Sequence, residues 1–511
     1  MKLTIRSLLP SRNYDALIAA IAGFLIIHAF TRHSGIGISP DSVVYMSTAA
    51  NIHDHGVIND FSGSPMMDFP AFYPIFLSTL LFLTGHDAMG LGPTLNSLLF
   101  ALLIFVCGWL MERFSFRSKW YKWTLLSFIV LSPCLLEVYS MIWSETLFLL
   151  LLVVFILYTR RYFLSHRART LIEIGIIAGL ASVTRYAGIT LIGTGGLLIL
   201  CDSSLKKNKK LLHFVLFGCV ACAFPAVNLI RNRLVTGTLT GFREPAIRSF
   251  GRNLHDFGSV FCDWMPFFNN HYALASLLGA FWIIFFTGAF LTRLVRRERF
   301  FSYENIATAY FIVYTVFILL TATISRFQQL DSRLLSPLFI PWIWGATCWI
   351  PTRIAAWAPY RRRWAIIASI VAALCFQAGQ LLAFNDNWEG IKYAGIPGYT
   401  EDQWTHSQTI DFVRRHRRML QSGGTLYSNA YEGVWFLTGL QADMIPHKDL
   451  HQDIREFLAE DKFYVIWFND GLNPDLLSMD FIGHYKKLTD KYTFDDGAVY
   501  FFTSDSTRAK Y

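Results

Sequence analysis

Apolar runs long enough to cross a lipid bilayer recur along most of this chain. They extend from Asp15 to Phe384 and are bounded by charged residues. Each is roughly 16 to 22 residues long, and about 20 apolar residues in a helix span the hydrocarbon layer. Of the 511 residues, 53% are hydrophobic and only 16% are charged, which is typical of a membrane protein. The sequence therefore predicts a polytopic α-helical membrane protein.

Lysine and arginine residues are clustered in the short connections between the apolar runs. Because cytoplasmic loops of membrane proteins carry an excess of these residues, we interpret the clusters as cytoplasmic. The net charge of +9 then reflects membrane topology, and no nucleic-acid partner is expected. The clusters lie at 2–12, 113–122, 160–169, 206–210, 293–299 and 353–363.

Three apolar runs lie between the first two basic clusters, whereas two cytoplasmic clusters require an even number of crossings between them. The middle run, 71–84, is the shortest and contains Pro74. We therefore expect it to be re-entrant or interfacial. The cytoplasmic placement of the basic clusters then predicts about eleven transmembrane helices, a cytoplasmic N-terminus, and a first outer loop at 32–70.

The composition changes beyond Phe384. Short apolar and aromatic segments predict strands, and two segments with helical periodicity lie between them. We expect residues 1–384 to form the transmembrane domain and residues 385–511 to form a compact extracytoplasmic α/β domain with a structural or acceptor-binding role. The predicted strands are GTLYSNA, GVWFLTG, KFYVIWFND and AVYFFTS, and the predicted helices are TIDFVRRHRRML and HKDLHQDIREFLAED.

Arginines occur in connections that this topology places outside the cell, where the positive-inside bias disfavours them. These are Arg185, Arg231, Arg326 and Arg333. Charges at membrane depth are costly and tend to face a protein-lined cavity, so we expect a functional cavity that opens outward. The alternative for each arginine is an ion pair with an outer acid such as Glu145 or Asp331.

The first outer loop places an acid at the predicted start of a short helix. Ser39 and Pro40 precede Asp41, and Tyr45 and Ala49 follow it at helical spacing. A carboxylate interacts favourably with the dipole at this end of a helix. On local evidence, Asp41 is either a helix-terminal charge or a catalytic group.

Four segments together resemble the GT-C glycosyltransferases, which include the protein O-mannosyltransferases and the lipid A aminoarabinose transferase. Leu334 departs from the family pattern, in which tyrosine is usual. A single acid, Asp41, stands where several members have an acid pair, which leaves a bound divalent cation open. The four segments are PDSVVYMSTAANIHDHG…FPAFYPIFLSTLLFLTG (40–85), LSPCLLEVYSMIWSETLFLLLLVV (131–154), GLASVTRYAGITLI (179–192) and SRLLSPLFI (332–340).

The resemblance implies that a sugar moves, with inversion, from a polyprenyl-phosphate donor to a glycolipid, polysaccharide or protein acceptor of the cell envelope. An acceptor hydroxyl needs a base, and Asp41 is the candidate. The departing lipid phosphate needs charge stabilisation by arginine. Arg185 and Arg333 are the first candidates, and Arg231 and Arg326 are the second. Acceptor-binding or supporting roles fall to Tyr45, Asp54, Asp68, Tyr73, Glu145 and Tyr186.

No metal ligands are assigned, because His53 and His55 are two residues apart and make a poor pair on one helix face. Two rival functions stay open: a transporter or flippase of a lipid-linked saccharide, and a glycan ligase or polymerase. A transporter is expected to carry polar residues near the bilayer midplane. In this chain the polar residues gather at one face, which favours an enzyme. We expect this enzyme in the bacterial inner membrane.

Overall fold

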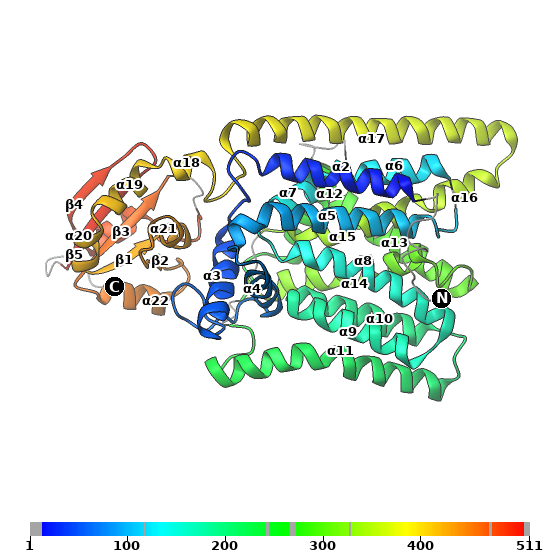
Figure 1. Cartoon of the computed structure of the whole chain (residues 1–511), viewed down its shortest axis with the longest axis horizontal. Coiled ribbons are helices and arrows are strands. Elements are labelled where there is room, and N and C mark those ends of the chain that lie inside the picture. Colours follow the sequence, from blue (N-terminus) through cyan, green and yellow to red (C-terminus); the bar gives the residue numbers. More distant parts are fainter. Residues whose placement is uncertain are drawn as a thin grey trace. The chain divides into compact units, whose positions relative to one another are not determined.

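The computed structural model describes residues 13–116, 118–241, 245–265, 272–326, 329–469 and 473–504. The chain divides into two compact units (Figure 1). The first comprises Met1–Arg32 and Pro65–Gly390, and the second comprises His33–Ser64 and Ile391–Tyr511. The expected first outer loop, 32–70, is thus divided between the two units.

The first unit is helical, and its long helices run alongside one another (Figure 1). Two short 3-10 helices, η1 and η2, precede α10 and α13. The elements are α2 (Tyr14–Phe30), α4 (Phe72–Thr84), α5 (Ala88–Met111), α6 (Lys119–Val130), α7 (Pro133–Ser140), α8 (Glu145–Ser165), α9 (Ala168–Thr184), η1 (Tyr186–Gly188), α10 (Ile189–Cys201), α11 (Lys207–Thr236), α12 (Phe250–Trp264), η2 (Tyr272–Leu274), α13 (Ala275–Arg296), α14 (Tyr303–Ile324), α15 (Ser332–Thr347), α16 (Trp349–Ala355) and α17 (Pro359–Ala394).

The predicted class, a polytopic helical membrane protein, is confirmed. Within the described residues, seven helices are long and apolar enough to cross a membrane, or eight if α6 and α7, which meet at a bend of 47°, form one span. The helices α2, α4 and η1–α10 are apolar but have only 10–17 residues. The expectation of about eleven crossings, which counts such helices, stays a prediction.

The helix α4 coincides with the segment that the sequence predicts to be re-entrant. It has 13 residues, which at 1.5 Å per residue is about 20 Å, shorter than the roughly 30 Å of hydrocarbon. Tyr73 and Leu77 are buried, whereas Phe82 and Leu83 near the other end are exposed. Other apolar helices of the unit, such as α10, are equally short, so the re-entrant or interfacial placement of this segment stays a prediction.

Small residues allow the helices of the first unit to pack closely. The helix α2 lies against α5 (Figure 1). A Cβ atom at Gly108 of α5 would come within 2.5 Å of the Cβ atom of Ala16 on α2. Close backbone approach of this kind is the usual basis of helix association in membranes, where lipid tails are as apolar as the side chains.

The second unit combines one helix from the first outer loop, α3 (Pro40–His55), with an α/β structure. A five-stranded sheet has the order β2-β1-β3-β5-β4; β1 is parallel to β2 and β3, and β5 is antiparallel to β3 and β4. Its elements are α18 (Asp402–Thr405), α19 (Gln408–Arg415), α20 (Arg417–Ser422), β1 (Thr425–Ser428), α21 (Tyr431–Thr438), β2 (Asp443–Met444), α22 (His451–Ala459), β3 (Lys462–Phe468), α23 (Met479–Tyr485), β4 (Lys487–Thr493) and β5 (Gly497–Thr503).

One strand predicted from the sequence is wrong. GVWFLTG, residues 433–439, lies in the helix α21, which ends at Gly439 with a left-handed φ of 67°. A short apolar run does not by itself distinguish a strand from a buried helix. The glycine in the left-handed conformation is a common helix terminator and was the available signal.

Candidate active site

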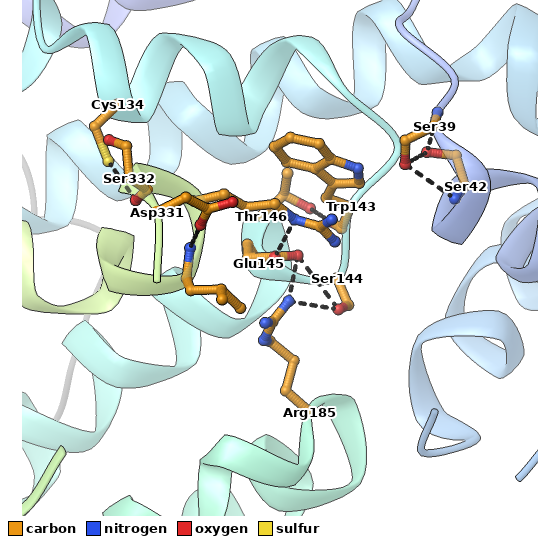
Figure 2. Close-up of polar contacts among 12 residues, drawn as sticks. Ser39, Ser42, Cys134, Trp143, Ser144, Glu145, Thr146, Arg185, Asp331 and Ser332 are labelled. Carbon is orange, nitrogen blue, oxygen red and sulfur yellow. Dashed lines mark hydrogen bonds and ion pairs between the residues drawn. The ribbon is translucent and has the colours of Figure 1, made fainter. Parts of the chain in front are cut away.

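Glu145, the first residue of α8, lies between two arginines and is fully buried. Arg333 donates a hydrogen bond from Nε to Glu145 Oε1 at 2.7 Å, and Arg185 pairs through Nη1 with Oε2 (Figure 2). The arginine side chains are only 15% and 17% exposed. The two first-choice arginines therefore meet at a carboxylate, as the ion-pair alternative from the sequence also predicts.

The formal charge of this cluster is positive, because one carboxylate faces two guanidinium groups. A buried charge is tolerated when it is paired and hydrogen-bonded. Here Glu145 fixes both arginines in place, and the three groups together keep one formal positive charge. The carboxyl groups of Asp331 and Glu137 also interact with Arg333, so Arg185 carries most of the uncompensated charge. Such a cluster is suited to bind an anion such as a phosphate.

The end of α9 and the start of α15 position the two arginines. Arg185 ends α9 with an extended backbone, φ −146° and ψ 141°, and its Nη1 donates to Ser144 Oγ at 3.3 Å. Arg333 lies in the first turn of α15, where the Asp331 side chain caps the helix by accepting from the Leu334 N–H at 2.8 Å (Figure 2). Each arginine is thus held at a helix end.

The turn before α8 carries residues that the sequence did not point to. The guanidinium carbon of Arg333 lies 3.9 Å from the centroid of the Trp143 ring, a cation–π contact. Buried Asn96 of α5 donates to Tyr139 O at 3.0 Å and to Met141 O at 2.7 Å. An asparagine inside an apolar run was the signal for this support, since polar groups in membrane helices usually have a partner.

Tyr73 of α4, which the sequence assigned a supporting role, lies beside Glu145 and Thr146. Tyr310 and Tyr314 of α14 lie near Arg185. All three tyrosines are buried. The carboxylate–arginine cluster is therefore surrounded by aromatic side chains, which lower the local dielectric and strengthen its interactions.

Arg231, Tyr186 and Asp68 do not pair with Glu145 in the described part of the chain. Arg231 Nη1 donates to Met66 O at 2.5 Å, and the Tyr186 hydroxyl donates to Met67 O at 2.8 Å. Asp68 lies against Gly241. These residues fix the segment that leads into α4. For Arg231 and Tyr186 this geometry supports a structural role.

Arg326, the remaining second-choice arginine, lies in the connection between α14 and α15 and is not an ion-pair partner of Glu145 among the residues described.

Asp41 lies in the second unit, in the first turn of α3. The helix begins where the sequence predicts it: Ser39 caps it, and the Ser39 and Ser42 side chains each accept from the other's backbone N–H, at 3.4 and 3.1 Å (Figure 2). Tyr45, one turn further on, is buried. The neighbours of Asp41 include Glu432, which comes from the α/β part of the chain.

Asp54 is not brought together with Asp41. It lies in the last turn of α3, and 13 residues at 1.5 Å each separate the two carboxylates by about 20 Å along the helix axis. Its side chain is 57% exposed and pairs with His53 at 2.7 Å. Among the residues that the structure describes, no three His, Cys, Asp or Glu side chains gather into a possible metal site.

The architecture is the GT-C fold. The chain is similar to ArnT from Cupriavidus metallidurans in the apo state, with a TM-score of 0.56 and 12% identity over 95% of this chain and 97% of ArnT. It is also similar to the same protein bound to undecaprenyl phosphate, with a TM-score of 0.53 and 12% identity over 96% and 98%. The fold expected from the sequence resemblance is thereby confirmed. No protein-family model and no curated protein sequence matches the chain.

Proposed function

We propose that the protein is an integral membrane glycosyltransferase that moves a sugar from a polyprenyl-phosphate donor to a cell-envelope acceptor. The observation that carries the proposal is the convergence of Arg185 and Arg333 on Glu145, in a chain with the GT-C fold. ArnT, which has this fold, binds undecaprenyl phosphate in one of its structures. A lipid-linked phosphate is therefore the anion that we assign to the arginine pair.

The chemistry explains why two arginines are needed. When the bond between the sugar and the phosphate oxygen breaks, its electron pair stays on the departing lipid phosphate. Fixed donors in a site that excludes water stabilise this developing charge without having to reorganise. Glu145 and Trp143 hold Arg333 in place, and Glu145 and Ser144 hold Arg185. No second acid is required to protonate a leaving phosphate.

We assign the base to Asp41. The acceptor hydroxyl oxygen forms a bond to the anomeric carbon while its proton moves to the carboxylate, and the anomeric configuration is inverted in this single displacement. The reaction takes place at the outer face of the bacterial inner membrane. The N-terminus is then cytoplasmic, and the second unit is extracytoplasmic.

A binding experiment tests the donor assignment directly. Purified protein in nanodiscs is titrated with undecaprenyl phosphate, and Arg185→Ala and Arg333→Ala each weaken binding by about 10- to 100-fold, since hydrogen bonds to charged groups contribute about 1.5–3 kcal/mol. The matched control is Arg169→Ala, on the same helix as Arg185, whose side chain is 89% exposed and pairs with Glu173. Equal affinities of all four proteins would refute the assignment.

A second experiment tests the reaction. Envelope glycolipids and glycoproteins from cells with the wild-type gene, the Asp41→Asn variant and no gene are compared by mass spectrometry. We expect a glycosylated product only with the wild type, although the variant inserts into the membrane normally. Uptake of a lipid-linked saccharide by vesicles without any covalent product would instead identify a transporter.

A further inference from the structure

The N-terminal turn of α3, which carries Asp41, is anchored to residues 396–400 of the same unit. Tyr399 donates its backbone N–H to Ile38 O at 2.7 Å, and the Thr400 hydroxyl donates to Ile36 O at 3.2 Å. Gly398 has a φ of +122°, and its Cα faces Ile38 O so closely that no Cβ would fit. The position of the proposed base thus depends on the chain that follows α17.

The helix α21 brings a second carboxyl group to the same place. It packs against α3, and Glu432 lies in its first turn, as Asp41 lies in the first turn of α3. The Tyr399 ring lies against α21, where a Cβ at Gly433 would come within 2.5 Å of the ring. The Tyr399 hydroxyl also hydrogen-bonds Glu432. One tyrosine is therefore joined both to the start of α3 and to Glu432.

Aromatic contacts also hold α21 against the segment that follows α3. Phe61, beyond the end of α3, lies with its ring centroid 6.0 Å from that of Tyr431 and 5.0 Å from that of Trp435. The Tyr431 hydroxyl is a second hydrogen-bond partner of Glu432. Both ends of the segment 33–64 that carries Asp41 are thus packed against residues of the α/β part.

The electrostatics of Glu432 are set by its surroundings. Burial, together with the nearby Asp41 carboxylate, raises the pKa of Glu432 to about 7, whereas the hydrogen bonds from Tyr431 and Tyr399 act in the opposite direction. An ordinary glutamate has a pKa of about 4.3. Glu432 therefore changes its charge near neutral pH, next to the group that has to accept a proton.

The other elements packed on α21 carry their titratable groups elsewhere. Arg414 of α19 donates to Leu437 O at the far end of α21. Tyr427 of β1 directs its hydroxyl to Glu460 at 2.6 Å. The groups that face Glu432 are thus Asp41, Tyr399 and Tyr431.

We propose that Glu432 is a positioning residue for Asp41: it fixes the base through Tyr399 and places a second carboxyl group near it. The inference rests on the proposed function and gives the α/β part of the chain a role in the reaction. Once Glu432 is ionised, its negative charge adds to the electrostatic attraction for the proton of the acceptor hydroxyl.

The test uses the full-length protein in membrane vesicles with a host lipid extract as the donor, and it follows product formation by mass spectrometry. For the wild type we expect the transfer rate to rise as the pH increases through about 7. In Glu432→Gln the inflection disappears and kcat falls about 10- to 100-fold, while the KM for the donor lipid stays the same, as expected when a reacting group is displaced slightly. Glu432→Asp retains the inflection.

The controls separate this inference from the proposed function. Glu456→Gln, on an exposed position of α22 in the same unit, is expected to keep the wild-type rate and pH profile. If Glu432→Gln behaves like the wild type while Asp41→Asn is inactive, the positioning role is refuted and the glycosyltransferase assignment stands. If Asp41→Asn is active, the proposed function itself fails. If Glu432→Gln does not fold, an Asp variant without the inflection refutes the inference.

Discussion

Arg333 is held by Trp143 and Glu145 in two different ways. The indole ring lies 3.9 Å below the guanidinium carbon, and the carboxylate accepts from Nε at 2.7 Å. The cation–π contact keeps the guanidinium over the ring, and the hydrogen bond directs its Nε–H toward the carboxylate. An arginine restrained in this manner loses little additional entropy when it binds a phosphate.

Trp143→Leu is expected to weaken undecaprenyl phosphate binding by about 2- to 30-fold, because a cation–π contact contributes about 0.5–2 kcal/mol. Trp143→Phe keeps an aromatic face and is expected to lose less affinity. Titration in nanodiscs measures both variants. Equal losses for Leu and Phe would show that the ring acts by volume and not by its interaction with the cation.

Glu145→Gln is expected to lower the free energy of unfolding by about 3–5 kcal/mol, because two buried guanidinium groups lose the carboxylate that both of them pair with. Thermal unfolding in detergent measures the change. Glu173→Gln is the matched control: Glu173 also pairs with two arginines, Arg161 and Arg169, but these are 44% and 89% exposed. Exposed pairs contribute about 1 kcal/mol or less. Equal stability of the two variants would contradict the burial argument.

Lys122→Met is expected to destabilise the first unit by a similar amount, about 3–5 kcal/mol. Lys122 of α6 is buried and pairs with Asp15 at 2.6 Å and with Glu112 at 2.8 Å. Its removal takes away the cation that both carboxylates share. Lys119→Met, at an exposed position of the same helix, is the control and is expected to unfold at the wild-type temperature.

The same lysine illustrates what a sequence can and cannot reveal. Lys122 belongs to a basic cluster that we read as a topology signal. Such clusters and the length of the apolar runs predict the class of the protein. The partners of Lys122, Asp15 and Glu112, come from other helices. A pattern along one segment holds no information on which distant acid will meet a given base.

The candidate site also contains residues that the sequence predicts and residues that only the packing brings there. Arg185, Arg333 and Glu145 could be selected from the sequence because charges are rare beside apolar runs. Opposite charges at the same membrane face are also expected to pair. Trp143 was not predicted, since an aromatic residue beside a span is ordinary. Glu432 was not predicted either, because it stands directly before a segment that resembles a strand and because its proximity to Asp41 arises from packing between residues almost 400 positions apart.

Gly398→Ala is expected to slow sugar transfer without changing donor binding. A left-handed φ of +122° and the close approach to Ile38 O leave no room for a methyl group, and strain of this kind costs about 1–3 kcal/mol. The segment 396–400 must then shift away from the start of α3, so that Asp41 loses its anchor. We expect slower sugar transfer but unchanged binding of undecaprenyl phosphate, because the arginine pair lies in the first unit. Gly483→Ala, in α23 with open space around it, is the control; equal transfer rates of both variants would contradict the prediction.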